Sequence, residues 1–215
     1  MDWETKRERL LEATLGHVPF DGWTEASLRR AAADLGLTHA DVLDAFPGGA
    51  IEALDLFMAL ADRRMVEDLE ASDLASMKVR ERVLLAVRRR LERALPHREA
   101  VRRGLAALAL PQNAPLAIKS LYRTVDAVWF GIGDTSTDWN FYSKRAILAG
   151  VYGATVLYWL DDRSEDQARS WDFLTRRLDD AIKVPRALGQ GVERVRKLVA
   201  DFPSPFRRFD RAFRG

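Results

Sequence analysis

Apolar side chains recur every three or four positions along most of this chain, and that spacing constrains its fold more than any other feature. The clearest runs are Val79, Val83, Val87, Leu91 and Leu95; Ile118, Leu121, Val125, Val128 and Ile132; and Trp171, Leu174, Leu178 and Ile182. A period of 3.6 residues places such side chains on one face of an α-helix, whereas a half-buried strand needs strict alternation. No window alternates for long enough to predict a strand. The sequence therefore predicts an all-α fold.

Proline and glycine divide this helical pattern into segments. We predict about ten helices, near residues 2–16, 24–35, 39–45, 49–71, 76–94, 97–110, 114–132, 138–162, 165–183 and 187–202. The pattern further suggests three parts: a helix-turn-helix over 1–50, a helical bundle over 51–185 and a basic amphipathic segment over 186–215. The 215 residues are enough to bury a sizeable core.

Charge is distributed unevenly along the chain. The formal net charge is +2, but residues 183–215 hold nine Lys or Arg against three Asp or Glu, a net of +6. A basic segment on a slightly acidic body predicts contact with an anionic surface. The longest uncharged apolar run has fifteen residues, Ala146 to Leu160, which is shorter than the roughly 20 that a membrane-spanning helix needs.

Residue patterns that carry chemistry are missing from the sequence. His17, His39 and His97 have no partners at metal-ligand spacing, and there is no cysteine, phosphate loop or serine elbow. The acidic pairs Asp161–Asp162 and Asp179–Asp180 lie near helix ends without an obvious partner, so we expect them to face solvent. The sequence thus predicts no catalytic residue, no metal and no cofactor. An enzyme built from scattered residues remains an alternative.

Residues 5–60 resemble the amino-terminal domain of TetR-type regulators. The resemblance rests on a first helix ending near Gly16, a turn at Gly36 and a short third helix closed by Phe46–Pro47. It implies a TetR-like bundle and, as an alternative function, a DNA-binding transcriptional regulator. Residues 36–50 contain no Lys or Arg, however, while Asp41 and Asp44 lie on the would-be recognition helix. Carboxylates repel phosphates, so we expect no nucleic-acid partner.

The uncharged run from Ala146 follows an aromatic and charged cluster, STDWNFYSKR. Thr137 is a good N-cap, and Asp138 suits the positive end of the helix dipole. A helix apolar on all sides is normally buried at the centre of a bundle. Its small residues either admit neighbouring helices or leave room for a lipid. The candidate lipid-binding residues are Leu121, Val125, Trp129, Ile147, Gly150, Val151, Ala154, Leu157 and Tyr158.

Residues 133–184 strongly resemble the coenzyme Q biosynthesis protein nine family, accessory proteins of ubiquinone biosynthesis. The STDWNFYSKR run, the helix of small residues after it and the Trp171–Phe173–Leu174 pattern carry the resemblance. It implies a TetR-like fold without catalytic activity, homodimerisation, binding of isoprenoid quinone intermediates or other lipids, and partnership with the demethoxyubiquinone hydroxylase. The family's partner-facing patch corresponds to Asp138, Asn140, Phe141, Tyr142 and Arg145, which we expect to be exposed.

The basic carboxy-terminal segment has the pattern of a helix lying in a membrane interface. Its apolar stripe consists of Leu188, Val192, Val195, Val199, Phe202, Phe206, Phe209 and Phe213. Docking of this stripe on the protein's own bundle is the alternative. The expected location is cytoplasmic and peripheral to the inner membrane in a bacterium, or the matrix side of the inner membrane in a mitochondrion.

Overall fold

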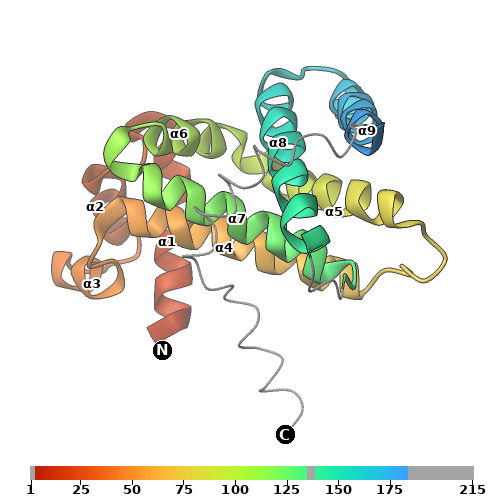
Figure 1. The fold of residues 1–215 in the computed structure, drawn as a ribbon. Helices are drawn as coiled ribbons and strands as arrows, with labels where there is room; N and C mark the ends of the chain where they lie inside the picture. The colour runs from red at the N-terminus through yellow and green to blue at the C-terminus, as the bar shows by residue number, and fades with distance from the viewer. Residues whose placement is uncertain (1–2, 135–138, 184–215) are drawn as a thin grey trace, which may run out of the picture. The chain divides into compact units, whose positions relative to one another are not determined.

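The computed structural model of the chain describes residues 3–134 and 139–183. In these ranges the secondary structure consists of helices, with no strand, and this confirms the all-α prediction (Figure 1). The α-helices are α1 (Trp3–Asp21), α2 (Glu25–Asp34), α3 (His39–Ala45), α4 (Gly49–Glu70), α5 (Val79–Ala94), α6 (Arg98–Leu108), α7 (Ala114–Gly131), α8 (Trp139–Asp161) and α9 (Ala168–Lys183). Nine α-helices within the described ranges make the expected ten slightly too many, and the predicted helix over 187–202 lies outside those ranges.

Contacts divide the chain into two compact units. Among the described residues, unit 1 comprises 3–61 and 94–120, and unit 2 comprises 62–93, 121–134 and 139–183. Both α4 and α7 contribute residues to each unit, because the divisions at 61 and 120 fall inside these helices. These two units differ from the three parts that the sequence pattern suggests, and the division into three parts stays a prediction.

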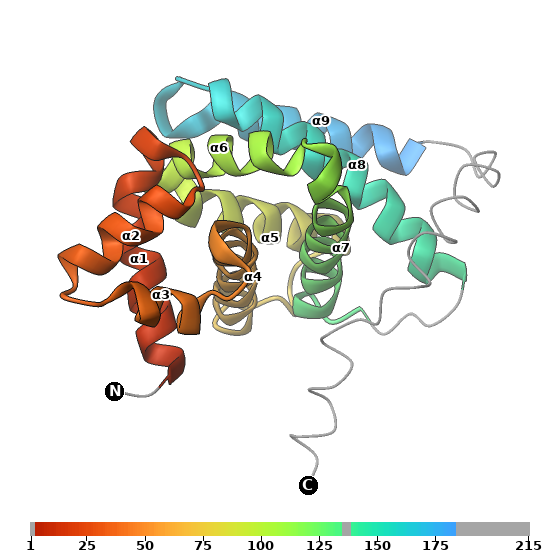
Figure 2. The ribbon, with the colours of Figure 1, turned by 90° about the vertical axis from the view of Figure 1, so that its left-hand side faces the viewer.

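Unit 1 contains the predicted helix-turn-helix. Helix α1 packs against α2, α3 and α6 (Figure 2). Thr24 begins α2 and Thr38 begins α3, each through a capping box with the residue three positions on, Ser27 and Asp41. In each capping box, the reciprocal bonds satisfy backbone groups that a helix end otherwise leaves open, and they fix where the helix starts.

Helix α1 ends at Asp21, five residues later than predicted. Gly16 is exposed inside the helix and does not end it, at a cost of about 1 kcal/mol relative to alanine. The helix continues because Val18, one turn before its end, is fully buried in the core of unit 1. Gly22, with a positive φ of 70°, supplies the left-handed residue that ends the helix.

The core of unit 2 encloses a polar network around Asp62 of α4, which is fully buried. The Asp62 carboxylate accepts hydrogen bonds from Arg90 Nε at 2.7 Å, Arg123 Nε at 3.2 Å and Thr124 Oγ1 at 2.9 Å. Arg90 also donates to the Tyr152 hydroxyl at 2.5 Å. The network thereby connects α4, α5, α7 and α8.

Candidate functional site

The end of α7 fixes the position of Asp134. The Asp134 N–H donates to the Trp129 carbonyl at 2.9 Å, and the Gly133 N–H donates to the Phe130 carbonyl at 3.0 Å. These two bonds form a Schellman motif, and Gly133 occupies its left-handed position with a φ of 79°. The backbone of Asp134 is therefore held immediately after α7.

Asp134 lies beside two basic residues near the start of α8. Lys144 Nζ is 2.9 Å from Asp134 Oδ1, and Arg145 Nη1 is 3.9 Å from Asp134 Oδ2. The Lys144 ammonium also lies 5.3 Å from the ring centroid of Trp129, within cation–π range. We call Asp126, Asp134, Lys144 and Arg145 the α7–α8 ion cluster.

Arg145 is buried at the centre of the α7–α8 ion cluster. Its Nε and Nη2 atoms lie 2.8 Å and 2.7 Å from the same oxygen of Asp126. The side chains of Arg145 and Asp126 are 7% and 5% exposed. The expected exposure of Arg145 is therefore wrong, because its guanidinium neutralises a carboxylate that α7 buries.

The predicted partner-binding residues are only partly described. Tyr142 is half-buried on α8, one turn before Arg145. Asp138 lies outside the described residues, as do the side chains of Asn140 and Phe141. Sequence reasoning missed Asp126 and Lys144. The usable signal was an aspartate inside the apolar repeat of α7, because a buried charge needs a partner.

Helix α8 has a buried side and an open side within this chain. Leu148, Val156 and Trp159 are buried, whereas Ile147 is 43% and Leu157 63% exposed. The expected burial on all sides is thus not observed. Helix α9 packs beside α8 in both ribbon views, and the ring of Phe173 stacks on that of Tyr158 with centroids 4.5 Å apart.

The predicted lipid-binding residues divide between these two environments. Val125, Trp129 and Val151 are buried, and Leu121 and Ala154 are half-buried. Ile147, Gly150, Leu157 and Tyr158 are exposed. The set therefore does not face a single space. Its exposed members follow the three-and-four spacing of one face of α8.

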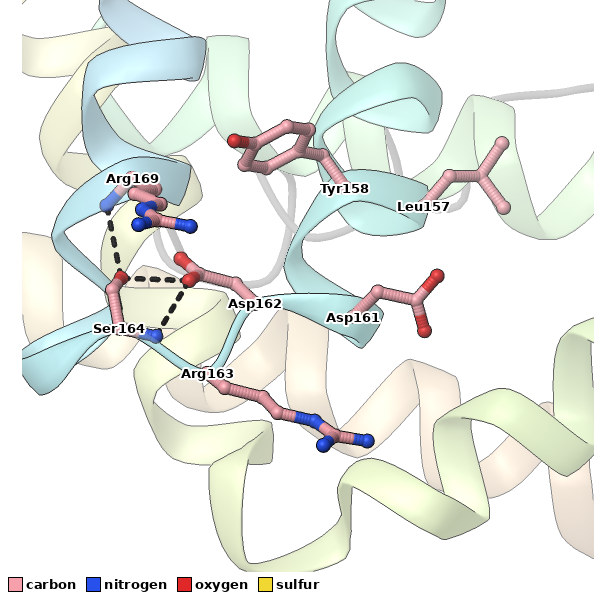
Figure 3. A pocket seen from close by; sticks show the side chains of 7 residues that line it. All are labelled: Leu157, Tyr158, Asp161, Asp162, Arg163, Ser164 and Arg169. Atoms are coloured by element: carbon pink, nitrogen blue, oxygen red, sulfur yellow. Dashed lines mark hydrogen bonds between the residues drawn. The ribbon is translucent and has the colours of Figure 1, made fainter.

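A pocket of about 460 Å³ opens at the corner between α8 and α9 (Figure 3). Its lining consists of Leu157, Tyr158, Asp161, Asp162, Arg163, Ser164 and Arg169. Leu157 and Tyr158 belong to the predicted lipid-binding set, but the remaining lining residues are charged, apart from Ser164. This composition differs from the apolar space that a prenyl chain requires.

Asp162 holds this corner together, contrary to the expectation that it faces solvent. It is buried, and its carboxylate accepts hydrogen bonds from the backbone N–H and the hydroxyl of both Ser164 and Ser170, at 2.6 to 2.9 Å. Figure 3 shows the two bonds from Ser164. The Ser170 N–H lies in the first turn of α9, so Asp162 acts as a cap. Asp179, of the other acidic pair, bonds Arg80 at 2.6 Å.

Asp162 should make stability depend on pH below about pH 4. Burial alone would raise the pKa of the Asp162 carboxyl, but hydrogen bonds from Ser164 and Ser170 outweigh it and lower the pKa to about 2. A pKa that is lower in the folded state adds stability above the unfolded value, and this is lost as pH falls through the folded value. We expect Asp162→Asn to be less stable than the wild type by about 2 kcal/mol at pH 7.

Urea denaturation at pH 7, 4 and 2.5 measures this difference. The gap between wild type and variant should narrow from pH 4 to pH 2.5, and Asp161→Asn, which alters the exposed neighbour, serves as the control. A gap that stays constant over this range would show that Asp162 does not act through its charge.

Within residues 3–134 and 139–183, no helix is both long and apolar enough to cross a membrane. Those same ranges contain no group of three or more His, Cys, Asp or Glu placed to hold a metal ion. The predicted membrane-binding residues, Leu188 to Phe213, lie outside the described ranges.

Helices α7, α8 and α9 carry most of the features described above, and residues 114–185 match the COQ9 family model. The chain carries a COQ9 domain. The mitochondrial ubiquinone biosynthesis protein COQ9 of Drosophila melanogaster is 33% identical over 188 residues, covering 86% of this chain and 57% of that protein. Human mitochondrial COQ9 is 33% identical over 193 residues, covering 85% and 60%. These similarities confirm the resemblance to the coenzyme Q family.

Rat mitochondrial COQ9 is 34% identical over 193 residues, covering 85% of this chain and 62% of that protein. The chain thus spans about six tenths of the length of the COQ9 proteins named here. Among solved structures, the TetR transcriptional regulator of Nitrosomonas europaea ATCC 19718 matches with a TM-score of 0.69 and 21% identity, over 83% of this chain and 98% of that one. This likeness confirms the TetR-like fold.

Proposed function

We propose that this chain is a non-catalytic accessory protein of ubiquinone biosynthesis that binds isoprenoid quinone intermediates and presents them to the demethoxyubiquinone hydroxylase. The observation that carries the proposal is the 33% identity to ubiquinone biosynthesis proteins over 86% of the chain. The COQ9 domain, residues 114–185, covers the α7–α8 ion cluster and the open side of α8. The same resemblance implies a homodimer, which stays a prediction.

The open side of α8 is the proposed binding surface for the apolar chain of the lipid. Ile147 and Leu157 expose apolar surface there. Between them, Gly150 and Ala154 are small residues, so that a lipid chain can approach the helix backbone closely. Burial of each CH₂ group stabilises a complex by roughly 0.8 kcal/mol. An apolar surface along several helical turns therefore favours a long isoprenoid chain over a small polar molecule.

The proposed membrane contact involves residues 186–215, which lie outside the described ranges. Their sequence combines the net positive charge with Leu, Val and Phe at helical spacing. Each Lys or Arg near an anionic membrane contributes roughly 1 kcal/mol of binding. We infer a peripheral position at the inner membrane, on its cytoplasmic side in a bacterium or its matrix side in a mitochondrion.

A DNA-binding role is less well supported than this proposal. Asp41 of α3 forms an ion pair with Lys6 and hydrogen bonds with Thr38, which keep the pKa of its carboxyl far below the usual range. Asp44 is exposed on the same helix. With two carboxylates and no Lys or Arg in α3, this helix would repel the DNA backbone.

Lipid carried through purification tests the proposed function directly. The protein should be purified without detergent and extracted with organic solvent, and the extract should be analysed by mass spectrometry. We expect prenylated quinones or their precursors at about one per chain or per dimer. A variant with Leu157→Glu, which places a charge on the open side of α8, should retain less. An extract without isoprenoid lipid would contradict the proposal.

Hydroxylase binding tests the other half of the proposal. Tyr142→Ala removes a half-buried aromatic ring from the predicted patch, and aromatic rings often dominate binding at interfaces. We expect binding to the demethoxyubiquinone hydroxylase to weaken at least tenfold, by roughly 1.4 kcal/mol or more, without unfolding. Tyr122→Ala, at another half-buried tyrosine, is the control. Unchanged affinity of the Tyr142 variant would exclude Tyr142 from the interface.

A further inference from the structure

The charge of Arg145 is directed into the protein although the residue belongs to the predicted partner-binding patch. Two of its N–H groups converge on one oxygen of Asp126 at 2.7 and 2.8 Å, and its third nitrogen faces Asp134 at 3.9 Å. Arg145 is 6% exposed. A guanidinium held in this way cannot also form the two parallel bonds by which arginine binds a partner's carboxylate.

The acidic side of this arrangement is held by α7 and by the turn that follows it. Asp126 lies on α7, and its side chain is almost fully buried. The Schellman motif at Gly133 holds Asp134 in place, and Asp134 also pairs with Lys144. Removal of one member of such a buried group leaves an uncompensated charge. The position of Arg145 therefore depends on both carboxylates.

Arg145 in turn constrains the first turns of α8. Tyr142 precedes it by three residues, so the two side chains lie on one face of the helix. Lys144, its neighbour, is held between Asp134 and the ring of Trp129. These bonds attach the beginning of α8 to the end of α7 at two consecutive residues.

We propose that Arg145 is a positioning residue: with Asp126 and Asp134 it fixes the start of α8 so that Tyr142 is presented to a protein partner. Arg145 itself does not contact that partner. This inference rests on the proposed function, because it assigns roles within the surface where the hydroxylase is proposed to bind. It also adds Asp126 and Asp134, which hold Arg145, to the residues on which the complex depends.

A double-mutant cycle separates positioning from direct contact. Asp126→Asn, Arg145→Gln and the double variant are compared for their affinity toward the hydroxylase. If Arg145 positions α8, each single variant should weaken binding about tenfold, and the double variant no more than either single one, because residues of one network are not additive. Arg80→Gln, which breaks the pair with Asp179 on α9, is the matched control and should bind like the wild type.

Hydrogen exchange provides a readout that needs no partner. Amides of residues 143–149 should exchange about tenfold faster in Asp126→Asn and Arg145→Gln than in the wild type, whereas the Arg80→Gln protein should match it. Asp134→Asn is a milder variant for the case in which the buried substitutions unfold the protein. It should accelerate exchange of the same amides while the remaining helices stay protected.

The outcomes distinguish this inference from the proposed function. The inference would be overturned if Arg145→Gln weakened binding while Asp126→Asn bound the hydroxylase and exchanged its amides like the wild type. Arg145 would then contact the partner directly. Unchanged exchange in both Asp126→Asn and Asp134→Asn would overturn it as well. If the variants exchange faster but the wild-type protein does not bind the hydroxylase, the result would support positioning by Arg145 and reject the proposed partner.

Discussion

Replacing Asp62 by alanine should lower the free energy of unfolding by about 3–5 kcal/mol, because the change removes a fully buried carboxylate that accepts hydrogen bonds from two buried arginines. Arg90 and Arg123 would then lie close together in the core without an anion between them. Urea denaturation followed by circular dichroism measures the loss.

The side chains around Asp62 cannot adjust their charge to compensate. Burial alone would lower the pKa of Arg90, but the charge of the Asp62 carboxylate and its hydrogen bond with Arg90 act against burial, and the pKa is raised. Burial also raises the pKa of Tyr152, so its phenol stays neutral. A guanidinium group is not deprotonated in proteins, so deprotonation of the arginines cannot offset the loss of Asp62.

Asp68→Ala is the matched control for Asp62→Ala. Asp68 lies on the same helix and also pairs with an arginine, Arg93, but both side chains are partly exposed. Solvent screens this pair, and its removal should cost less than about 1 kcal/mol. Equal losses in the two variants would show that the buried network does not stabilise unit 2 beyond an ordinary surface ion pair.

Replacing Trp159 by alanine should cost about 3–5 kcal/mol, the range measured for large aromatic residues in protein cores. Trp159 lies on the buried side of α8 and is fully inaccessible to solvent. The change leaves a cavity the size of an indole ring, which neighbouring side chains fill only partly. A lower midpoint in urea without a change in helix content at zero denaturant is the expected result.

Leu157→Ala provides the comparison from the other side of the same helix. Leu157 is 63% exposed, so its truncation in the isolated chain should cost less than about 1 kcal/mol. If both variants lost similar stability, Leu157 would be covered in solution, for example by the second chain of the predicted homodimer. Comparison of Trp159→Ala with Leu157→Ala thus shows which side of α8 is exposed to solvent.

Sequence reasoning located the helices because their signals are local. Thr24 and Thr38 accept the capping hydrogen bonds expected of helix starts, and the three-and-four repeats identified buried residues such as Val87, Val125 and Leu174. The same reasoning placed the end of α1 at Gly16. It failed there because the burial of Val18 is a tertiary contact, and such contacts override a weak preference of one residue.

The candidate site was harder to predict because its charges pair across the chain. Arg145 next to aromatic residues has the composition of an exposed binding patch, yet Asp126, nineteen residues earlier, holds it inside. Asp162 belongs to an acidic pair at a helix end, a pattern typical of solvent-exposed side chains, yet its carboxylate accepts hydrogen bonds from Ser164 and Ser170. One-dimensional spacing does not show which charges meet.

The sequence by itself determined the helical class, the helix starts and the resemblance to COQ9, because hydrophobic period, caps and short motifs are properties of neighbouring residues. It could not determine which side of α8 is buried, since a run apolar at nearly every position carries no periodic signal. Only the tertiary structure decided that Trp159 faces the core, that Leu157 faces outward and that Arg145 turns toward Asp126. These outcomes depend on which surfaces the other helices cover.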